Sequence, residues 1–360
     1  MRNRIPNPAA LTHRGAPHSP APRYLDVERE DFDDGWGPEH EPPARVATTV
    51  TIETARTIIS RNQSPDVPFT QSINPYRGCE HGCVYCYARP THAYLDLSPG
   101  LDFETKLFAK TNAVALLRSE LAAQHYQCSP IALGANTDPY QPIERKYRIT
   151  REILEVLAET RHPVTIVTKG ALVERDIDLL AALAAINAAQ VFISITTLDT
   201  ELARRLEPRA TAPLRRVETV RRLADAGIPV GVLVAPTIPG LNDNEMESIL
   251  EAATTAGART ASYIAVRLPR EVNPLFQAWL VEHVPLRAAK IMNLIRDIRG
   301  GRDNDPKFGR RMTGQGTIAA LLAQRFARAT KRLGLDGQRA PLAVQNFIPP
   351  QVSGAQLALF

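Results

Sequence analysis

Three cysteines stand close together in the first quarter of the chain. They occupy Cys79-Glu-His-Gly-Cys83-Val-Tyr-Cys86, so three residues separate the first pair and two the second. Soft thiolates select iron–sulfur clusters or zinc over hard cations, and three of them on one short loop suit a metal centre better than a disulfide framework. A cubane cluster held by three cysteines leaves one iron without a protein ligand, and an open position makes a metal centre catalytic. Cys128 stands apart from the motif.

Zinc is the alternative metal for this loop. It requires a fourth ligand, for which His81 and His92 are nearby candidates. His81 lies inside the first gap of the motif, and His92 would close an unusual spacing. With zinc or a structural cluster, the protein would be a non-catalytic metal-binding or sensor protein.

The elements around the cysteines indicate a parallel α/β fold, because short β-rich runs alternate with longer amphipathic helical patterns. The predicted strands are 71–74, 130–135, 164–168, 190–196, 229–235 and 261–266. The clearest helices are 150–160, with Thr150 as its N-cap, 171–186, 287–299 and 317–333. Six βα units fit a partial or complete barrel, and we expect a partial (βα)6 barrel of parallel strands.

The barrel is expected to be one part of a chain of 360 residues. Residues 1–45 hold many prolines and an acidic patch, which predicts a weakly ordered N-terminal extension. The barrel core is assigned to residues 62–270, a helical C-terminal extension to 271–345 and a tail to 346–360. The chain shows neither a signal-peptide pattern nor an apolar stretch of bilayer length, which predicts a cytoplasmic protein with no membrane partner.

Basic residues exceed acidic ones by a small margin. The 43 Lys and Arg residues against 38 Asp and Glu residues give a formal net charge of +5. This excess is compatible with a polyanionic partner but does not establish one, because solvated arginines are common on protein surfaces.

The cysteine spacing, with Tyr85 just before the last cysteine, resembles the signature of the radical S-adenosylmethionine (SAM) superfamily. Residues 62–326 resemble an uncharacterised bacterial family grouped with the spore photoproduct lyase-like (DNA repair photolyase-like) proteins. The matching segments are 74–89, 137–144, 150–151, 207–209 and 267–269.

The resemblance implies a [4Fe-4S] cluster on Cys79, Cys83 and Cys86, with SAM bound at the open iron. It further implies reductive cleavage of SAM to a 5′-deoxyadenosyl radical, which abstracts a hydrogen atom from the substrate. The electron would come from a one-electron reductant such as a flavodoxin or ferredoxin.

Ligands of parallel α/β barrels bind at the C-terminal ends of the strands, so these ends supply the candidate SAM contacts. The candidates are Tyr85 from the cysteine loop, Asn136, Thr137 and Asp138 after the second strand, Lys169 after the third, and Ser194 and Thr196 at the fourth. The segment 235–243 resembles the adenine-supporting segment of the superfamily. Two alternatives remain open: Asp138 as the cap of a simple turn, and Lys169 as a solvated lysine.

Spore photoproduct lyases reverse a thymine dimer in DNA, so the resemblance implies a nucleic acid or nucleotide lesion as one substrate class. Modification of a peptide or small metabolite is the alternative. Those lyases use a cysteine hydrogen donor near a strand end, whereas residues 135–137 contain no thiol and Cys128 precedes the strand. We therefore do not expect dimer reversal by the same route, and the sequence assigns no residue to the hydrogen-transfer step.

Overall fold

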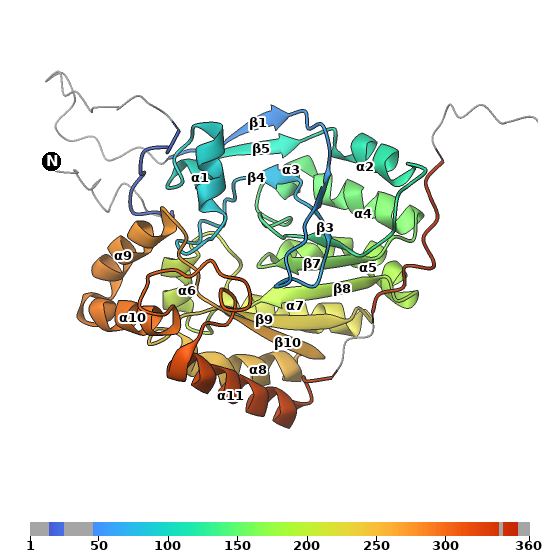
Figure 1. Ribbon diagram of the computed structural model, residues 1–360. Helices are drawn as coiled ribbons and strands as arrows, with labels where there is room; N and C mark the ends of the chain where they lie inside the picture. Colours follow the sequence, from blue (N-terminus) through green and yellow to red (C-terminus); the bar gives the residue numbers. More distant parts are fainter. Residues whose placement is uncertain (1–13, 25–45, 338–340, 352–360) are drawn as a thin grey trace, which may run out of the picture.

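The computed structural model describes residues 14–24, 46–337 and 341–351, in which two β-sheets are surrounded by helices (Figure 1). The larger sheet has the strand order β10-β9-β8-β7-β6-β3-β2, and the smaller has the order β1-β5-β4. The strands of the larger sheet are β2 (Ile59–Arg61), β3 (Gln71–Ile73), β6 (Ile131–Leu133), β7 (Val164–Thr168), β8 (Ala189–Ser194), β9 (Val230–Thr237) and β10 (Thr260–Ala265).

Strands β3, β6, β7, β8, β9 and β10 run parallel and lie in chain order across the larger sheet. They are the six predicted strands, shifted by one or two residues at some ends. Strand β2 pairs with β3 in the antiparallel direction. Within the described ranges no pairing joins β2 to β10, so the sheet is open, and the prediction of a partial parallel barrel is confirmed.

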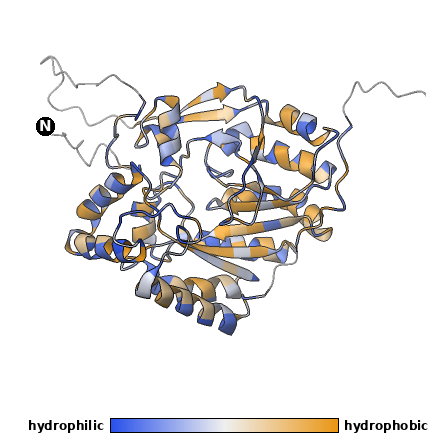
Figure 2. Ribbon diagram, viewed as in Figure 1, coloured by the Kyte–Doolittle hydropathy of each residue, from blue (hydrophilic) through white to orange (hydrophobic). Residues whose placement is uncertain are grey.

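Helices connect successive parallel strands and cover the sheet. They are α1 (Asp102–Thr105), α2 (Ala113–Leu121), α3 (Glu144–Tyr147), α4 (Ile149–Glu159), α5 (Ile177–Ala185), α6 (Thr200–Leu206), α7 (Pro213–Asp225) and α8 (Met246–Thr255), with the 3-10 helices η2 (Arg89–Leu95), η3 (Ala171–Asp176) and η4 (Asp243–Glu245). The central strands are apolar, and several helices turn an apolar face to them (Figure 2). In α4, for example, Ile153, Leu154 and Leu157 are buried while Glu155 is exposed, as an amphipathic helix requires.

The start of α4 differs from the prediction. Arg148, in the left-handed backbone region, occupies the N-cap position, and Thr150 lies inside the helix. The Thr150 hydroxyl donates to the Pro139 carbonyl (2.6 Å), while its backbone N–H donates to the Glu144 carboxylate (3.0 Å). Thr150 as N-cap is therefore wrong, because a carboxylate from the preceding helix serves the free N–H groups at this end.

The smaller sheet was not predicted. It consists of β1 (Thr49–Glu53), β4 (Tyr76–Arg77) and β5 (Lys106–Lys110). Strand β5 lies in the middle, parallel to β1 and antiparallel to β4. The chain thus leaves the large sheet after β3, passes through the small sheet and returns, and this detour carries the cysteine loop.

After β10 the chain is largely helical, with α9 (Val272–His283), α10 (Pro285–Ile298) and α11 (Gly316–Leu333). Helix α11 packs against α8 and α10 on the outside of the molecule (Figure 1). The final described segment packs against the end of α4, where the Ile348 N–H donates to the Thr160 carbonyl (2.9 Å). None of the described helices is both long and apolar enough to span a bilayer.

Candidate active site

The cysteine loop runs from Cys79 to Cys86 between β4 and η2. Gly78 (φ +73°) and Gly82 (φ +69°) adopt the left-handed backbone that the turns of this loop require. A Cβ at either position would also meet neighbouring atoms. The turns bring the side chains of Cys79, Cys83 and Cys86 to the same cavity, and all three are free thiols.

A buried ion pair holds the loop from behind. Arg89 is fully buried and donates to the carbonyls of Gly82 (3.1 Å) and Cys83 (2.9 Å) and to those of residues 99–100. The same guanidinium pairs with the equally buried carboxylate of Glu104 at 2.5 Å. Loop carbonyls, a buried cation and a buried anion therefore form one connected unit.

The N-terminal segment 14–24 completes this unit. The backbone N–H groups of Gly15 and Ala16 donate to the Glu104 carboxylate at 3.0 and 2.8 Å. A Cβ on Gly15 would overlap the carbonyl oxygen of Gly82, so the segment passes directly against the cysteine loop. A weakly ordered extension was expected over residues 1–45; the described part of it is anchored to the loop.

Two further side chains hold the loop from the barrel. Gln141 accepts a hydrogen bond from the Glu80 N–H (3.0 Å) and donates to the Gly78 carbonyl (3.1 Å). Arg209 pairs with the Glu80 carboxylate (3.0 Å), and its backbone N–H donates to the His81 carbonyl (3.2 Å). Two of the segments that carry the family resemblance, 137–144 and 207–209, thus fix the backbone of the loop.

Tyr85 belongs to a fully buried polar network. The Glu207 carboxylate accepts hydrogen bonds from the hydroxyls of Tyr85 and Thr196 and forms an ion pair with Arg216. Burial alone would raise the pKa of Glu207, but the Arg216 guanidinium lowers it, and the pKa is about 2. Arg216 also donates to the Ser194 carbonyl at 3.1 Å. Glu207 is therefore ionised, and it fastens the Tyr85 side of the loop to the end of β8.

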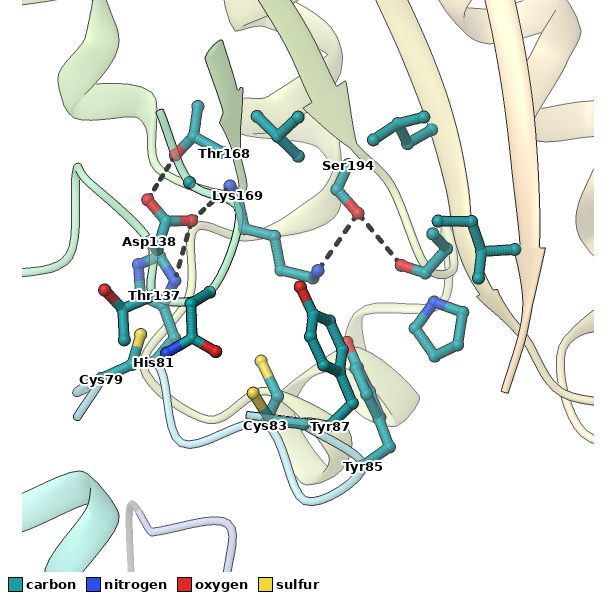
Figure 3. Close-up of a pocket in the computed structure, with 18 of the residues that line it drawn as sticks. Cys79, His81, Cys83, Tyr85, Tyr87, Thr137, Asp138, Thr168, Lys169 and Ser194 are labelled. Atoms are coloured by element: carbon teal, nitrogen blue, oxygen red, sulfur yellow. Dashed lines mark hydrogen bonds and ion pairs between the residues drawn. The ribbon is translucent and has the colours of Figure 1, made fainter. Parts of the chain in front are cut away.

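Asp138 joins the ends of β6 and β7 (Figure 3). Its carboxylate accepts hydrogen bonds from the Thr168 hydroxyl (2.6 Å) and the Lys169 N–H (2.8 Å), and it lies 3.3 Å from Nδ1 of His81. It also accepts from the Tyr140 N–H (2.9 Å), which makes the turn that was the alternative for this residue. Burial raises the pKa of Asp138, but His81 and these donors lower it to about 2.

The cavity measures about 190 Å³ and lies between the cysteine loop and the C-terminal ends of β6 to β10. The side chains at its wall include Cys79, His81, Cys83, Tyr85, Cys86, Tyr87, Asn136, Thr137, Asp138, Thr168, Lys169, Ser194, Leu233 and Arg267. The Lys169 ammonium donates to the Ser194 hydroxyl at 3.1 Å, which in turn donates to the Ala235 carbonyl at 3.0 Å (Figure 3). No described carboxylate forms a salt bridge with Lys169, so its charge is available to a ligand.

The thiols are buried deeply enough to resist ionisation. Burial raises the pKa of all three, to about 12 for Cys83, where the Glu207 carboxylate adds to the effect. The positive charges of Arg89 and Lys169 oppose the shift at Cys86. Metal binding to such thiols must release their protons, and the surrounding cations then offset part of the negative charge of the thiolates.

The donor set fits an iron–sulfur cluster better than a single metal ion. No three His, Cys, Asp or Glu side chains in the described ranges surround one point as a single zinc ion requires. In a four-iron cluster each cysteine binds a different iron, so the three sulfurs need not share a centre. The residues present therefore fit a cluster, which Cys79, Cys83 and Cys86 would hold and which would supply the open coordination position for SAM.

The structure brings most of the predicted site residues to this cavity. Cys79, Cys83, Cys86, Tyr85, Asn136, Thr137, Asp138, Lys169 and Ser194 line it, whereas Thr196 lies behind Tyr85 in the Glu207 network. The Thr137 hydroxyl donates to the Tyr76 carbonyl at 2.9 Å. Of these predicted residues, Asn136 and Lys169 present polar atoms that are not committed to the loop or its supports, so a SAM contact is best proposed for these two. Ser194 donates to the Ala235 carbonyl and accepts from the Lys169 ammonium, so it positions Lys169.

Several functional positions were not among the predicted site residues. Glu104 and Arg216 are single charged residues in ordinary helices, and their role depends on partners 15 and 9 residues away. Tyr87 and Arg267 also line the cavity. The family segments at 74–89 and 267–269 contain these last two residues, and their presence there was the signal that could have identified them.

Comparison with known proteins agrees with the geometry. The family model of the radical SAM superfamily matches residues 73–253, just over half of the chain. The chain belongs to the radical SAM superfamily. This superfamily holds a [4Fe-4S] cluster and SAM, and the matched range contains the cysteine loop and the ends of β6 to β9.

Among curated proteins, uncharacterized proteins of Mycobacterium tuberculosis and Mycobacterium bovis are each 37% identical over 232 residues, 64% of this chain and 68% of theirs. An uncharacterized protein of Methanocaldococcus jannaschii is 30% identical over 173 residues, 48% of this chain and 62% of its own.

Among solved structures, spore photoproduct lyase complexed with dinucleoside spore photoproduct has a TM-score of 0.58 at 16% identity, covering 84% of this chain and 85% of that one. A variant of that lyase with bound AdoMet and the same dinucleoside gives 0.55 at 16% identity, with 79% of each chain covered. The fold is thus that of the lyase, and the protein is a radical SAM enzyme with a spore photoproduct lyase-like architecture.

Proposed function

We propose that this enzyme cleaves SAM reductively at a [4Fe-4S] cluster held by Cys79, Cys83 and Cys86, and that the resulting 5′-deoxyadenosyl radical abstracts a hydrogen atom from a nucleic acid or nucleotide substrate. The observation that carries the proposal is the shared cavity: three free thiols line the same cavity as Asn136 and Lys169, the uncommitted polar groups at the ends of β6 and β7. The cluster and SAM supply the radical chemistry, and the chain positions and encloses them.

Each polar group of the cavity has a separate task in this proposal. Lys169, which has no carboxylate partner among the described residues, binds the SAM carboxylate. The Ser194 hydroxyl accepts a hydrogen bond from the Lys169 ammonium (3.1 Å) and so holds the Lys169 side chain in place. The amide of Asn136 faces the same ligand. Apolar groups such as Leu233 and Ile264 close the wall, which excludes water and stray hydrogen donors from the reacting centre.

The substrate class rests on two facts of different kinds. The lyase of similar fold is complexed with dinucleoside spore photoproduct, a nucleic-acid lesion. In this chain, a second cation that forms no salt bridge with a described carboxylate, Arg267, borders the cavity. Peptides and small metabolites are the competing substrates, and a one-electron reductant such as a flavodoxin or ferredoxin is the expected electron source.

The test is anaerobic reconstitution with iron and sulfide, followed by reduction with dithionite in the presence of SAM. We expect about four irons per chain by analogy with Cys-ligated cubane clusters, a paramagnetic resonance spectrum that changes on addition of SAM, and formation of 5′-deoxyadenosine. Cys79→Ala, Cys83→Ala and Cys86→Ala should each lose the cluster and the cleavage. Cys128→Ala is the matched control and should retain both, because Cys128 is not part of the cavity wall.

The competing outcomes are distinct. Stoichiometric zinc without SAM cleavage would make the loop a structural site and refute the proposal. Cleavage that survives replacement of any of the three loop cysteines would also contradict it.

A further inference from the structure

Arg267 occupies an unusual position for a charged side chain. Strand β10 ends at Ala265, the next residue still pairs with β9 through the Thr237 carbonyl (2.9 Å), and Arg267 then lines the cavity that also contains the cysteines. Its guanidinium carbon lies 5.0 Å from the ring centre of Tyr87, and one Nη contacts the sulfur of Met312 at 3.9 Å. No described carboxylate forms a salt bridge with it.

The three arginines that are almost fully buried in the described ranges, Arg89, Arg216 and Arg299, each donate to carboxylates or backbone carbonyls, although the Arg299 Nε has no acceptor. Arg267 contacts no carboxylate or carbonyl acceptor among the described residues. Arg89 and Arg216 pair with buried glutamates. Arg299 donates to four backbone carbonyls, including that of Ala265 at 3.0 Å. Burial lowers the pKa of Arg267 and the charge of Arg311 adds to this effect, whereas Tyr87 and the Asp66 carboxylate oppose it. A half-buried cation that has no salt bridge with a described carboxylate would be stabilised by a bound anion.

The family segments support the same interpretation. Segments 74–89, 137–144 and 207–209 contribute groups that form or fix the cysteine loop, and the 150–151 pair binds the Glu144 carboxylate. In the segment 267–269, the Arg267 side chain contacts neither the cysteine loop nor the Glu144 carboxylate. Unlike Arg77 and Arg151 of the other segments, which pair with carboxylates away from the loop, Arg267 has neither a loop contact nor a salt bridge among the described residues.

The surroundings of Arg267 indicate which anion it binds. Met312, its contact, ends a loop in which Lys307 and Arg310 are exposed and form no salt bridge with any described residue. Phe308 in the same loop is 59% exposed, and the Arg311 guanidinium lies 4.5 Å from its ring centre. Cations beside an exposed aromatic ring are the surface on which unpaired nucleic acid strands bind, through phosphates and stacked bases.

The loop 307–312 is also fixed in position relative to the end of β10. Arg299 donates at 3.0 Å to the carbonyls of both Arg310 and Arg311, and the same guanidinium donates to the carbonyl at the end of β10. Arg311 pairs with Asp66 at 2.5 Å, which ties the loop to the segment before β3. The backbone of this loop is therefore fixed relative to the end of β10, two residues before Arg267.

We propose that Arg267 binds a phosphodiester of the substrate and so places an unpaired nucleic acid segment across the cavity, with the loop 307–312 binding the adjoining backbone. This inference rests on the proposed function for its catalytic meaning. Planar guanidinium groups stacked on an aromatic ring match phosphate oxygens in a bidentate manner. Lys169 and Arg267 thus divide the ligands, the first binding SAM and the second the substrate.

The test is calorimetric binding of the thymidine dinucleotide d(TpT) to the anaerobically reconstituted protein, without reductant, so that no turnover is needed. We expect Arg267→Gln to weaken binding by roughly 10- to 100-fold, as for the loss of a charge-assisted hydrogen bond. Arg328→Gln, which removes the same charge from an exposed position of α11, should change the affinity by less than about twofold, since isolated surface charges contribute little. Iron content and thermal unfolding of the variants verify that both are folded.

A neutral analogue identifies the contact. The methylphosphonate form of d(TpT) should bind the unmodified protein as weakly as d(TpT) binds the Arg267→Gln variant, and the substitution should then have no further effect. Lys169→Met should lose SAM binding while it retains d(TpT) binding. If the substitution at Arg267 leaves d(TpT) affinity unchanged, or if the protein binds glutarate or an acidic peptide through Arg267 but not d(TpT), the proposal is overturned. If the protein binds d(TpT) through Arg267 but does not cleave SAM, the proposed SAM chemistry is refuted and the proposed role of Arg267 stands.

Discussion

The buried pair of Arg89 and Glu104 makes a sharp prediction about how the cysteine loop is held. Both side chains are fully inaccessible to solvent, and their charged atoms lie 2.5 Å apart. Glu104→Gln keeps the shape of the side chain but removes its charge, so the Arg89 cation is left buried without an anion. In addition, one of the two acceptor oxygens becomes an NH2 group that faces a backbone donor of residues 15–16.

The magnitude follows from these contacts. Removing one partner of a buried ion pair costs about 3–5 kcal/mol, and a buried N–H without an acceptor costs about 1–3 kcal/mol. The four backbone carbonyls that also accept from Arg89 limit the loss, and the two effects are not additive. We therefore expect the free energy of unfolding of the metal-free protein to fall by about 3–5 kcal/mol. This is a large fraction of the free energy of unfolding of a typical domain.

The measurement is urea unfolding, followed by circular dichroism, of the parent protein and two variants. Glu159→Gln is the matched control, because Glu159 pairs with Arg118 at a site where both side chains are about half exposed. The free energy of unfolding of the Glu159→Gln variant should fall by less than about 1 kcal/mol. After reconstitution, the Glu104→Gln protein should also release iron to a chelator faster than the control, since the loop carbonyls depend on Arg89. Equal unfolding midpoints for the two variants would refute the reasoning.

Two further predictions concern packing and protonation. Gly15→Ala should separate the segment 14–24 from the cysteine loop, seen as faster amide hydrogen exchange of residues 79–86, whereas Gly337→Ala, where a Cβ meets nothing within 4 Å, should leave that exchange unchanged. Burial lowers the pKa of His162 from 6.5 to about 4, so the unfolded chain binds a proton in this window that the folded chain does not, and stability is lost as the pH falls. The free energy of unfolding of the parent should therefore fall by up to about 1.4 kcal/mol per pH unit between pH 6.5 and 4 because of His162, and His162→Gln should remove this contribution. Parallel stability–pH profiles for the parent and the variant would show that the imidazole does not titrate in this way.

The sequence was most informative where local rules apply. Six parallel strands were predicted from apolar runs and their spacing, and each appears in the large sheet because a strand buried on both faces must be apolar along its length. The three cysteines were identified by spacing alone and lie at one cavity. The position of that cavity, at the C-terminal ends of the strands, follows from the parallel topology itself.

Long-range pairing was much harder to anticipate. Strand β1 pairs with β5 more than fifty residues later, and β4 is only two residues long, so no local pattern specifies the small sheet. The role of Glu207 depends on three side chains, those of Tyr85, Thr196 and Arg216, which come from three separate parts of the chain. In the sequence it is one acidic residue at the end of a helix, and nothing in its neighbours shows that it is buried.

The distinction between residues that hold the cysteine loop and residues that bind ligands depends on hydrogen-bond satisfaction. Thr137, Asp138 and Thr196 follow strand ends in the same way as Asn136 and Lys169 do, and residue type alone predicts the same role for all five. In the structure, the polar side-chain atoms of Thr137, Asp138 and Thr196 already form hydrogen bonds with backbone groups or buried side chains. A buried polar group that already has its partners gains little from a ligand, whereas one without them is stabilised by it. Ligand contacts in this cavity are therefore to be sought at its unsatisfied groups, which lie at the ends of β6, β7 and β10.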